Sequence, residues 1–111
     1  MALLATAAAS RAGVELVLVA VPCAVGGDTY ANTGREVLVL SNLGAVPAIV
    51  SVAVQWPVDG RSVAAHQVSI PAGTILAIGP FGPGLYSDPA TGLVHLTYSS
   101  VADLYARVLQ V

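Results

Sequence analysis

The stretch GGDTYANTGREVLVLSN (residues 26–42) brings together residue types that could bind a phosphate group or a metal ion. A phosphate-binding P-loop ends in Gly-Lys-Ser/Thr, and the chain contains no lysine. A dinucleotide-binding GxGxxG turn leads into a helix, whereas these glycines lead into REVLVL, which reads as a strand. A calcium loop needs several carboxylates at alternate positions, and only Asp28 is available before Glu36. The stretch is therefore interpreted as a turn-forming connection before a strand at 36–42.

The nucleophiles and metal ligands give no better pattern. Cys23 is the only cysteine, so it has no disulfide partner within the chain, and its apolar neighbours favour a buried, inert thiol. His66 and His95 lie in strand-like runs without a second His or Cys at ligand spacing. The chain has no GxSxG elbow, and most of its acidic residues adjoin turn signals rather than a shared cleft. We therefore expect no catalytic residues, no cofactor and no metal site.

Aromatic and apolar residues in loops are the better candidates for contact with a partner. The loop GPFGPGLYSDPATG (79–92) presents three such residues on a scaffold that proline stiffens, and a stiff loop loses little entropy on docking. The interface candidates are Phe81, Leu85, Tyr86 and Tyr30. In an alternative interpretation, Phe81 folds inward and caps the core. Trp56 and the tyrosines could form a sugar-stacking platform, but Trp56 at a strand end is interpreted as a core anchor.

Apolar runs of strand length, separated by turn-forming residues, recur along the chain and predict an all-β fold. Strands are expected at residues 14–20, 36–42, 48–56, 65–70, 74–78 and 93–98. Within 48–56, the larger apolar set that ends at Trp56 is expected to face the core. Turns are expected at Asp59–Gly60 and at 71–73. The prolines and glycines of 79–84 are incompatible with a helix or a central strand.

The final segment, 101–111, has two interpretations. Its apolar residues fall at helical spacing, but they also alternate as in a strand. The preceding strand-length runs favour a last strand that closes a sheet. We expect a small antiparallel β-sandwich or barrel of seven or eight strands, jelly-roll or immunoglobulin-like. Residues 13–111 form this single domain, and residues 1–12 form an N-terminal arm that could reach a neighbouring subunit.

The composition points to assembly. Hydrophobic residues make up 56% of the chain and charged residues 9%, with a net charge of -2. Such a balance gives no electrostatic footprint for nucleic acid. A lone subunit with so few charges would have poor solubility, so we expect other subunits to cover much of its surface. The alternative is that small Ala and Val side chains inflate the apolar count harmlessly. The first residues lack the basic segment of a signal peptide, and Arg11 and Glu15 interrupt the apolar run, so no membrane association is expected.

Three stretches together resemble a family of small, β-rich structural proteins of tailed-bacteriophage virions. They are GDTYANTGREVLVLSN, VSIPAGTILAIGPFGPGLYSD and GLVHLTYSSVADLYARVLQV, and the resemblance spans residues 11–111. It implies a head decoration or minor head protein at the capsid surface, made in the host cytoplasm. The implied partners are further copies of the chain and a major capsid protein, without a small-molecule substrate. A place in the neck or tail is a variant of this prediction.

Two other functions remain open at the level of sequence. A β-sandwich binding module, carbohydrate-binding or adhesive, would be a monomer with exposed aromatic residues. An enzyme of unknown type is disfavoured because the nucleophile, metal and phosphate motifs are missing, and a carboxylate pair in a deep pocket would revive it.

Overall fold

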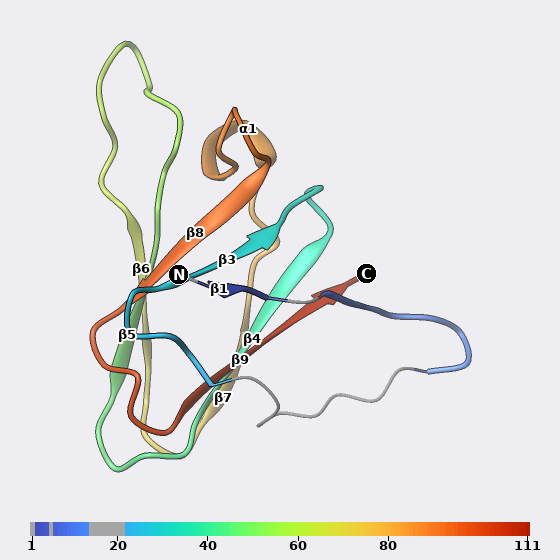
Figure 1. The fold of residues 1–111 in the computed structure, drawn as a ribbon, viewed down its shortest axis with the longest axis vertical. Helices are drawn as coiled ribbons and strands as arrows, with labels where there is room; N and C mark the ends of the chain where they lie inside the picture. The colour runs from blue at the N-terminus through green and yellow to red at the C-terminus, as the bar shows by residue number, and fades with distance from the viewer. Residues whose placement is uncertain (1, 5, 14–21) are drawn as a thin grey trace.

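The computed structural model describes residues 2–4, 6–13 and 22–111. Two β-sheets face each other (Figure 1), one of five strands and one of four. The five-stranded sheet runs in the order β1 (Ala2–Leu3), β3 (Asp28–Ala31), β8 (Leu93–Tyr98), β5 (Ala48–Val52), β6 (His66–Ile70). The four-stranded sheet runs β2 (Thr6–Ala8), β9 (Leu104–Gln110), β4 (Glu36–Asn42), β7 (Ile75–Ile78). The predicted all-β, sandwich-like and largely antiparallel class is confirmed.

The core follows from residue alternation along the central strands. The side chains of Leu38 and Leu40 in β4 and of Val108 in β9 point to the same face of their sheet. All three are buried between the two sheets. Val94 and Leu96 of β8 close the core from the other sheet. Because side chains of a strand alternate between its two faces, each of these strands presents one apolar row to the core. Burial of these rows is the main stabilising term of the fold.

Strand 48–56 is shorter than expected. Val50 and Val52 are buried as predicted, but β5 ends at Val52 and Trp56 is 41% exposed. The prediction of Trp56 as a core anchor is therefore wrong. The backbone N–H groups of Gln55 and Trp56 donate to the carbonyl oxygen of Leu85 instead of continuing the sheet. This contact lifts the chain away from the core before Pro57, which cannot donate a ladder hydrogen bond.

The interpretation of residues 26–35 as a connection alone is also wrong. Asp28–Ala31 forms β3, which pairs antiparallel with β8, with Tyr30 opposite Val94. The reversal itself is confined to the residues after β3, where Gly34 takes φ 91°. Turn-forming residue types therefore concealed a short strand, because Asp and Thr can occupy strand positions when their side chains find hydrogen bonds.

The remaining predicted strands are found. β6, β7 and β8 match the runs 65–70, 74–78 and 93–98 to within one residue at each end. The final segment is a strand and not a helix, since β9 pairs with β4 over its whole length. The predicted strand at 14–20 lies outside the described residues.

The described part of the N-terminal arm pairs with this same chain. β1 lies parallel to β3 and β2 lies parallel to β9, so the arm crosses from one sheet to the other. Leu4, between these two strands, is buried, and its N–H donates to Thr29. The described residues therefore add a short edge strand to each sheet.

A short helix, α1 (Pro83–Tyr86), corrects the prediction that 79–84 excludes helix. Proline is tolerated in the first turn of a helix, where its missing N–H has no partner to lose. The predicted turn at Asp59–Gly60 is confirmed, because both residues have positive φ and Val58 pairs with Arg61 across it. This turn ends a long hairpin extension, residues 53–65, that projects from the sandwich beside α1 (Figure 1). Within the described residues, no helix has the length and apolarity needed to cross a membrane.

Candidate interaction surface

Tyr30 is the clearest correction among the predicted interface residues. It lies in β3 with its side chain fully buried (0% exposed), not in an exposed loop. Burial raises the pKa of the Tyr30 phenol above its ordinary value, and the nearby Glu36 carboxylate acts in the same direction. A neutral phenol enclosed by the core is a packing residue, so Tyr30 is not available to a partner.

Phe81 takes the inward position that was its alternative. It is 7% exposed, and its ring lies 4.9 Å from that of Tyr86 and 6.0 Å from that of His66. Both ring pairs are within the range of favourable aromatic contact. Phe81 therefore caps the core and is wrong as an interface residue, while Tyr86 is half-buried against it.

Leu85 is the predicted interface residue that the structure does expose. Its side chain is 43% exposed on α1, and its carbonyl oxygen accepts the N–H groups of Gln55 and Trp56. The indole Nε1 of Trp56 donates to the carbonyl oxygen of Ser87 at 2.9 Å. These bonds hold Trp56 on the outside of α1, with part of its ring in solvent. The sequence signal that could have placed it there is Pro57, directly after it.

Together α1 and the hairpin extension form an exposed apolar region, here called the apical surface. Its large exposed apolar residues are Trp56, Val58, Val63 and Leu85. The charged residues between Glu36 and Asp88 are Asp59 and Arg61, both at the hairpin tip. The apical surface is therefore apolar on its flanks and charged at its tip.

A buried amide fixes the loop that carries α1. The Nδ2 of Asn32 donates to the carbonyl oxygen of Phe81 at 3.0 Å and to the Oγ of Ser87 at 3.1 Å. Its Oδ1 accepts the N–H of Gly34. Asn32 is buried, so each of these bonds replaces a contact with water that folding removes. The predicted turn former thus anchors both ends of α1 to the turn after β3.

Glu36 stabilises the same turn from the other side. Its carboxylate accepts the backbone N–H and the Oγ1 of Thr33, the N–H of Arg35 and the Nε2 of Gln110. Burial acts to raise the pKa of Glu36, but the hydrogen bonds from Thr33, Gln110 and Arg35 outweigh it and hold the pKa below its ordinary value. The carboxylate therefore has a structural role, because its oxygen atoms accept these hydrogen bonds and hold the turn in place.

A second buried carboxylate lies at the opposite end of β3. The Oδ2 of Asp28 accepts the phenol of Tyr98 at 2.8 Å and the N–H of Ala24 at 3.2 Å. Cys23 lies beside them; burial raises the pKa of its thiol to about 12, against a lowering by the hydrogen bond with Tyr98 and a further raising by Asp28. A thiol with this pKa is protonated at neutral pH and a poor nucleophile. The predicted buried thiol is confirmed.

The two histidines lie at separate places and do not share a cluster of the described acidic residues. His95 lies on the outer face of β8 with its Nε2 3.6 Å from the Oδ2 of Asp88, and His66 packs edge-on against Phe81. Within the described ranges, no group of three or more His, Cys, Asp or Glu side chains is placed to hold a metal ion.

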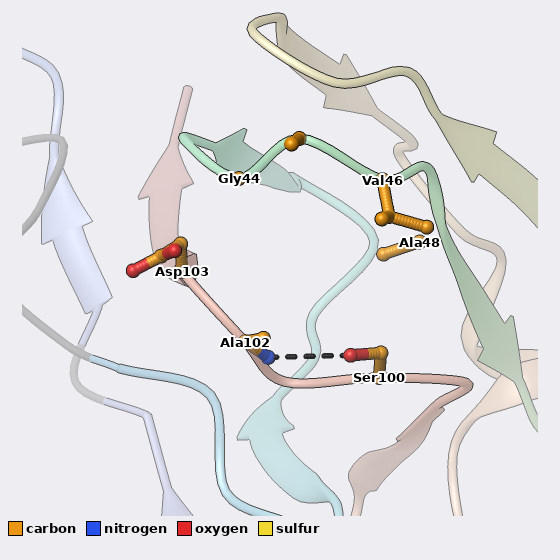
Figure 2. A pocket seen from close by; sticks show the side chains of 7 residues that line it. Gly44, Val46, Ala48, Ser100, Ala102 and Asp103 are labelled. Atoms are coloured by element: carbon orange, nitrogen blue, oxygen red, sulfur yellow. Dashed lines mark hydrogen bonds between the residues drawn. The ribbon is translucent and has the colours of Figure 1, made fainter.

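One shallow pocket lies at the end of the sandwich formed by the β4–β5 and β8–β9 connections. Its volume is about 190 Å³, and Figure 2 shows the side chains that line it. The lining residues are Gly44, Ala45, Val46, Ala48, Ser100, Ala102 and Asp103. The Oγ of Ser100 accepts the N–H of Ala102, so the hydroxyl is engaged by its own turn. A single carboxylate among small apolar side chains gives this pocket no pair of groups for acid–base or nucleophilic catalysis.

Comparison of the sequence with family models, with curated proteins and with solved structures gives no match. The candidate functional region is therefore identified from the structure alone. It is the apical surface, which contains Leu85, a predicted interface residue, and Trp56, which was expected in the core.

Proposed function

We propose that this chain is a structural protein of a tailed-bacteriophage virion, a capsid decoration or minor head protein that self-associates and stabilises the particle. Its partners are further copies of itself and the major capsid protein at the capsid surface. A position in the neck or tail is a variant of the same role. The resemblance of residues 11–111 to such proteins supports the proposal, and so does the chemistry of the surface.

The exposed apolar side chains carry the proposal. The described residues expose eleven large apolar side chains, on a chain with four basic and six acidic residues. They include Val25, Val46 and Leu3, each more than half exposed, at separate places on the surface. Scattered apolar residues are normal on a monomer, but so few charges oppose association only weakly. A subunit that is covered by neighbours on a lattice keeps this surface out of water.

The direct test is the protein content of particles. Virions of the phage that encodes the chain are purified through a density gradient and analysed by quantitative mass spectrometry. The expected result is the chain in a fixed copy ratio to the major capsid protein, and a lower pressure or heat tolerance of particles that lack it. A chain that is abundant in infected cells but absent from purified particles would overturn the proposal.

The exposed ring of Trp56 favours a second candidate, a carbohydrate-binding or adhesive module. Indole faces stack on sugar rings, and Trp56 lies on the apical surface with its Nε1 already bonded to Ser87, which fixes the ring. This candidate predicts a monomer that binds glycans on an array and loses that binding in Trp56→Ala and Tyr86→Ala. A glycan array without signal above that of the Trp56→Ala variant eliminates it.

A further inference from the structure

Both sheets end on the same side of the sandwich. β6 is the last strand of the five-stranded sheet and β7 the last strand of the four-stranded sheet. They are consecutive in the chain, joined by the turn at Pro71–Gly73, in which Gly73 has φ 73°. Within residues 2–4, 6–13 and 22–111, no further strand pairs with either of them. This side therefore presents two open sheet edges.

The backbone of β7 shows which of its groups are free to pair. The N–H of Asn42 in β4 donates to the carbonyl oxygen of Thr74, just before β7. In an antiparallel pair, hydrogen-bonded and non-hydrogen-bonded residues alternate. Counting from this bond along the register of β4 and β7, the N–H and C=O groups of Ile75 and Ala77 point away from β4. The side chains of both residues are exposed on the outer face of the sheet.

The same count on β6 gives a different surface. The backbone groups of Ile49 in β5 and of Ala53, directly after β5, form hydrogen bonds on the β8 side. Along β5, residues that bond on this side alternate with residues that bond to β6. The outward backbone groups of β6 then belong to Gln67 and Ser69, whose side chains are polar and exposed. Of the two edges on this side of the described residues, β7 is thus the apolar one.

Within the part of the chain that the structure describes, the β7 edge lacks the usual protection against pairing. Natural edge strands are blunted by charged side chains, by internal proline, by bulges or by a covering element. Residues 62–87 contain no Asp, Glu, Lys or Arg, and β7 itself is Ile-Leu-Ala-Ile. Its edge residue Ile75 is 49% exposed. An edge of this kind is a template for another strand.

We propose that β7 pairs antiparallel with β7 of a second copy of this chain about a two-fold axis through Leu76. This register places Ile75 opposite Ala77 of the second copy, so that the outward backbone groups bond to each other and the two four-stranded sheets become continuous. The proposal rests on the self-association in the proposed function and names the surface responsible for it.

The absence of charge on the strand favours a second copy as the occupant. The two-fold axis places Leu76 beside its own equivalent and Ile75 opposite Ala77 of the second copy, so a charged residue at the axis would meet a like charge. A strand from a different protein would impose no such restriction. The uncharged sequence of β7 meets the two-fold condition, and the pairing would pack the side chain of Ile75 beside that of Ala77 of the second copy on the outer face of the continuous sheet.

Two substitutions of Ala77 test the edge. Ala77→Pro removes an N–H that points away from β4, so it spares the native ladder but blocks a second strand. Ala77→Lys places two charges near the axis. The expected result, by light scattering, is a wild-type mass that falls twofold in both variants while thermal unfolding stays cooperative. Ala45→Lys, on the exposed β4–β5 turn, is the matched control and should keep the wild-type mass.

Cross-linking tests the register without depending on those variants. Ile75→Cys and Ala77→Cys are prepared separately and then mixed under mild oxidation. Facing residues in this register are close enough for a disulfide, so the mixture should give a covalent dimer and each variant alone should give far less. A folded Ala77→Pro protein with wild-type mass, a monomeric wild type, or a mixture that cross-links no faster than its components would overturn the pairing. Particle content decides the proposed function separately, since a virion protein could assemble through another surface.

Discussion

The phenol of Tyr98 in β8 donates to the carboxylate of Asp28 in β3 at 2.8 Å, and this bond ties two neighbouring strands at the edge of the core. Asp28 is fully buried, and its other described partner is the N–H of Ala24. A carboxylate in this position depends on its few donors. The pair therefore contributes to the stability of the fold.

Removal of the phenol should destabilise the protein. Tyr98→Phe leaves a buried carboxylate oxygen with one donor fewer, which costs about 1–3 kcal/mol. Urea denaturation followed by circular dichroism measures the difference. Tyr105→Phe is the control, because Tyr105 is half-buried on β9 and loses a hydroxyl of the same kind outside this cluster. Equal effects of the two substitutions would contradict the role assigned to the Tyr98–Asp28 bond.

The stability of the protein should fall in acid partly through Glu36. Its folded-state pKa is held below the ordinary value, so its contribution is fully present above the unfolded-state pKa and is lost as the pH falls through the folded-state pKa. Glu36→Gln should remove this part of the acid dependence and lower stability at neutral pH by about 1–3 kcal/mol. Unfolding free energies measured from pH 7 to pH 3 provide the test, with Asp59→Asn at the exposed hairpin tip as the control. If the unfolding free energy of Glu36→Gln depends on pH as steeply as that of the wild type, the structural role of the carboxylate is contradicted.

Cys23 should be unreactive in the folded protein. Burial raises its pKa to about 12, so the thiol is protonated and enclosed at pH 8. A chromogenic disulfide reagent should label the chain at least tenfold more slowly than in guanidinium chloride. The signal is specific because the chain has one cysteine. Native labelling as fast as that of the denatured chain would show an exposed thiol.

Trp56 gives an optical measure of the apical surface. It is the only tryptophan and is partly exposed, so a subunit with a free apical surface should show strong acrylamide quenching. Addition of empty capsids should reduce that quenching if the apical surface docks on them. Trp56→Phe should change the unfolding free energy by less than about 1 kcal/mol, since exposed substitutions have small effects. A loss of several times that value would place the ring in the core.

Asn32→Ala should loosen the loop that carries α1. The substitution leaves the carbonyl of Phe81 and the hydroxyl of Ser87 without their amide donor in a buried site. The expected cost is about 1–3 kcal/mol, together with faster amide hydrogen exchange in residues 82–88. Exchange that accelerates equally across β9 would indicate a global effect and not a local one.

The strands could be predicted where apolar residues recur over a run of strand length between turn-forming residues. β4, β8 and β9 are examples, because a strand with a buried face requires apolar residues along it. β3 could not be predicted in this way. The side chain of Asp28 accepts hydrogen bonds from the N–H of Ala24 and from the phenol of Tyr98, which is 70 residues away in the sequence. Hydrogen-bond partners that exist only after folding leave no mark on local periodicity.

The interface candidates show the same limit of local sequence patterns. Leu85 is exposed as predicted, whereas Phe81 and Tyr30 are buried because strands and a helix close over them. Loop-like composition did not distinguish an aromatic residue that faces a partner from one that caps the core. For Trp56 the error is the reverse. Its predicted core position requires a strand that extends as far as Trp56, but β5 ends before it. For Trp56 and Phe81 the deciding contact is long-range: Trp56 with Leu85, and Phe81 with Asn32.

The parallel pairing of β2 with β9 determines how the sandwich would respond to force. β2 follows the N-terminus and β9 precedes the C-terminus, and Thr6 lies opposite Val108 in a common direction. Tension applied to the start of β2 and the end of β9 would slide these strands past each other and load their hydrogen bonds together. An antiparallel hairpin pulled from its open end would instead release its bonds one at a time. β2 and β9 are therefore joined in shear, the geometry in which a small number of hydrogen bonds resists extension best.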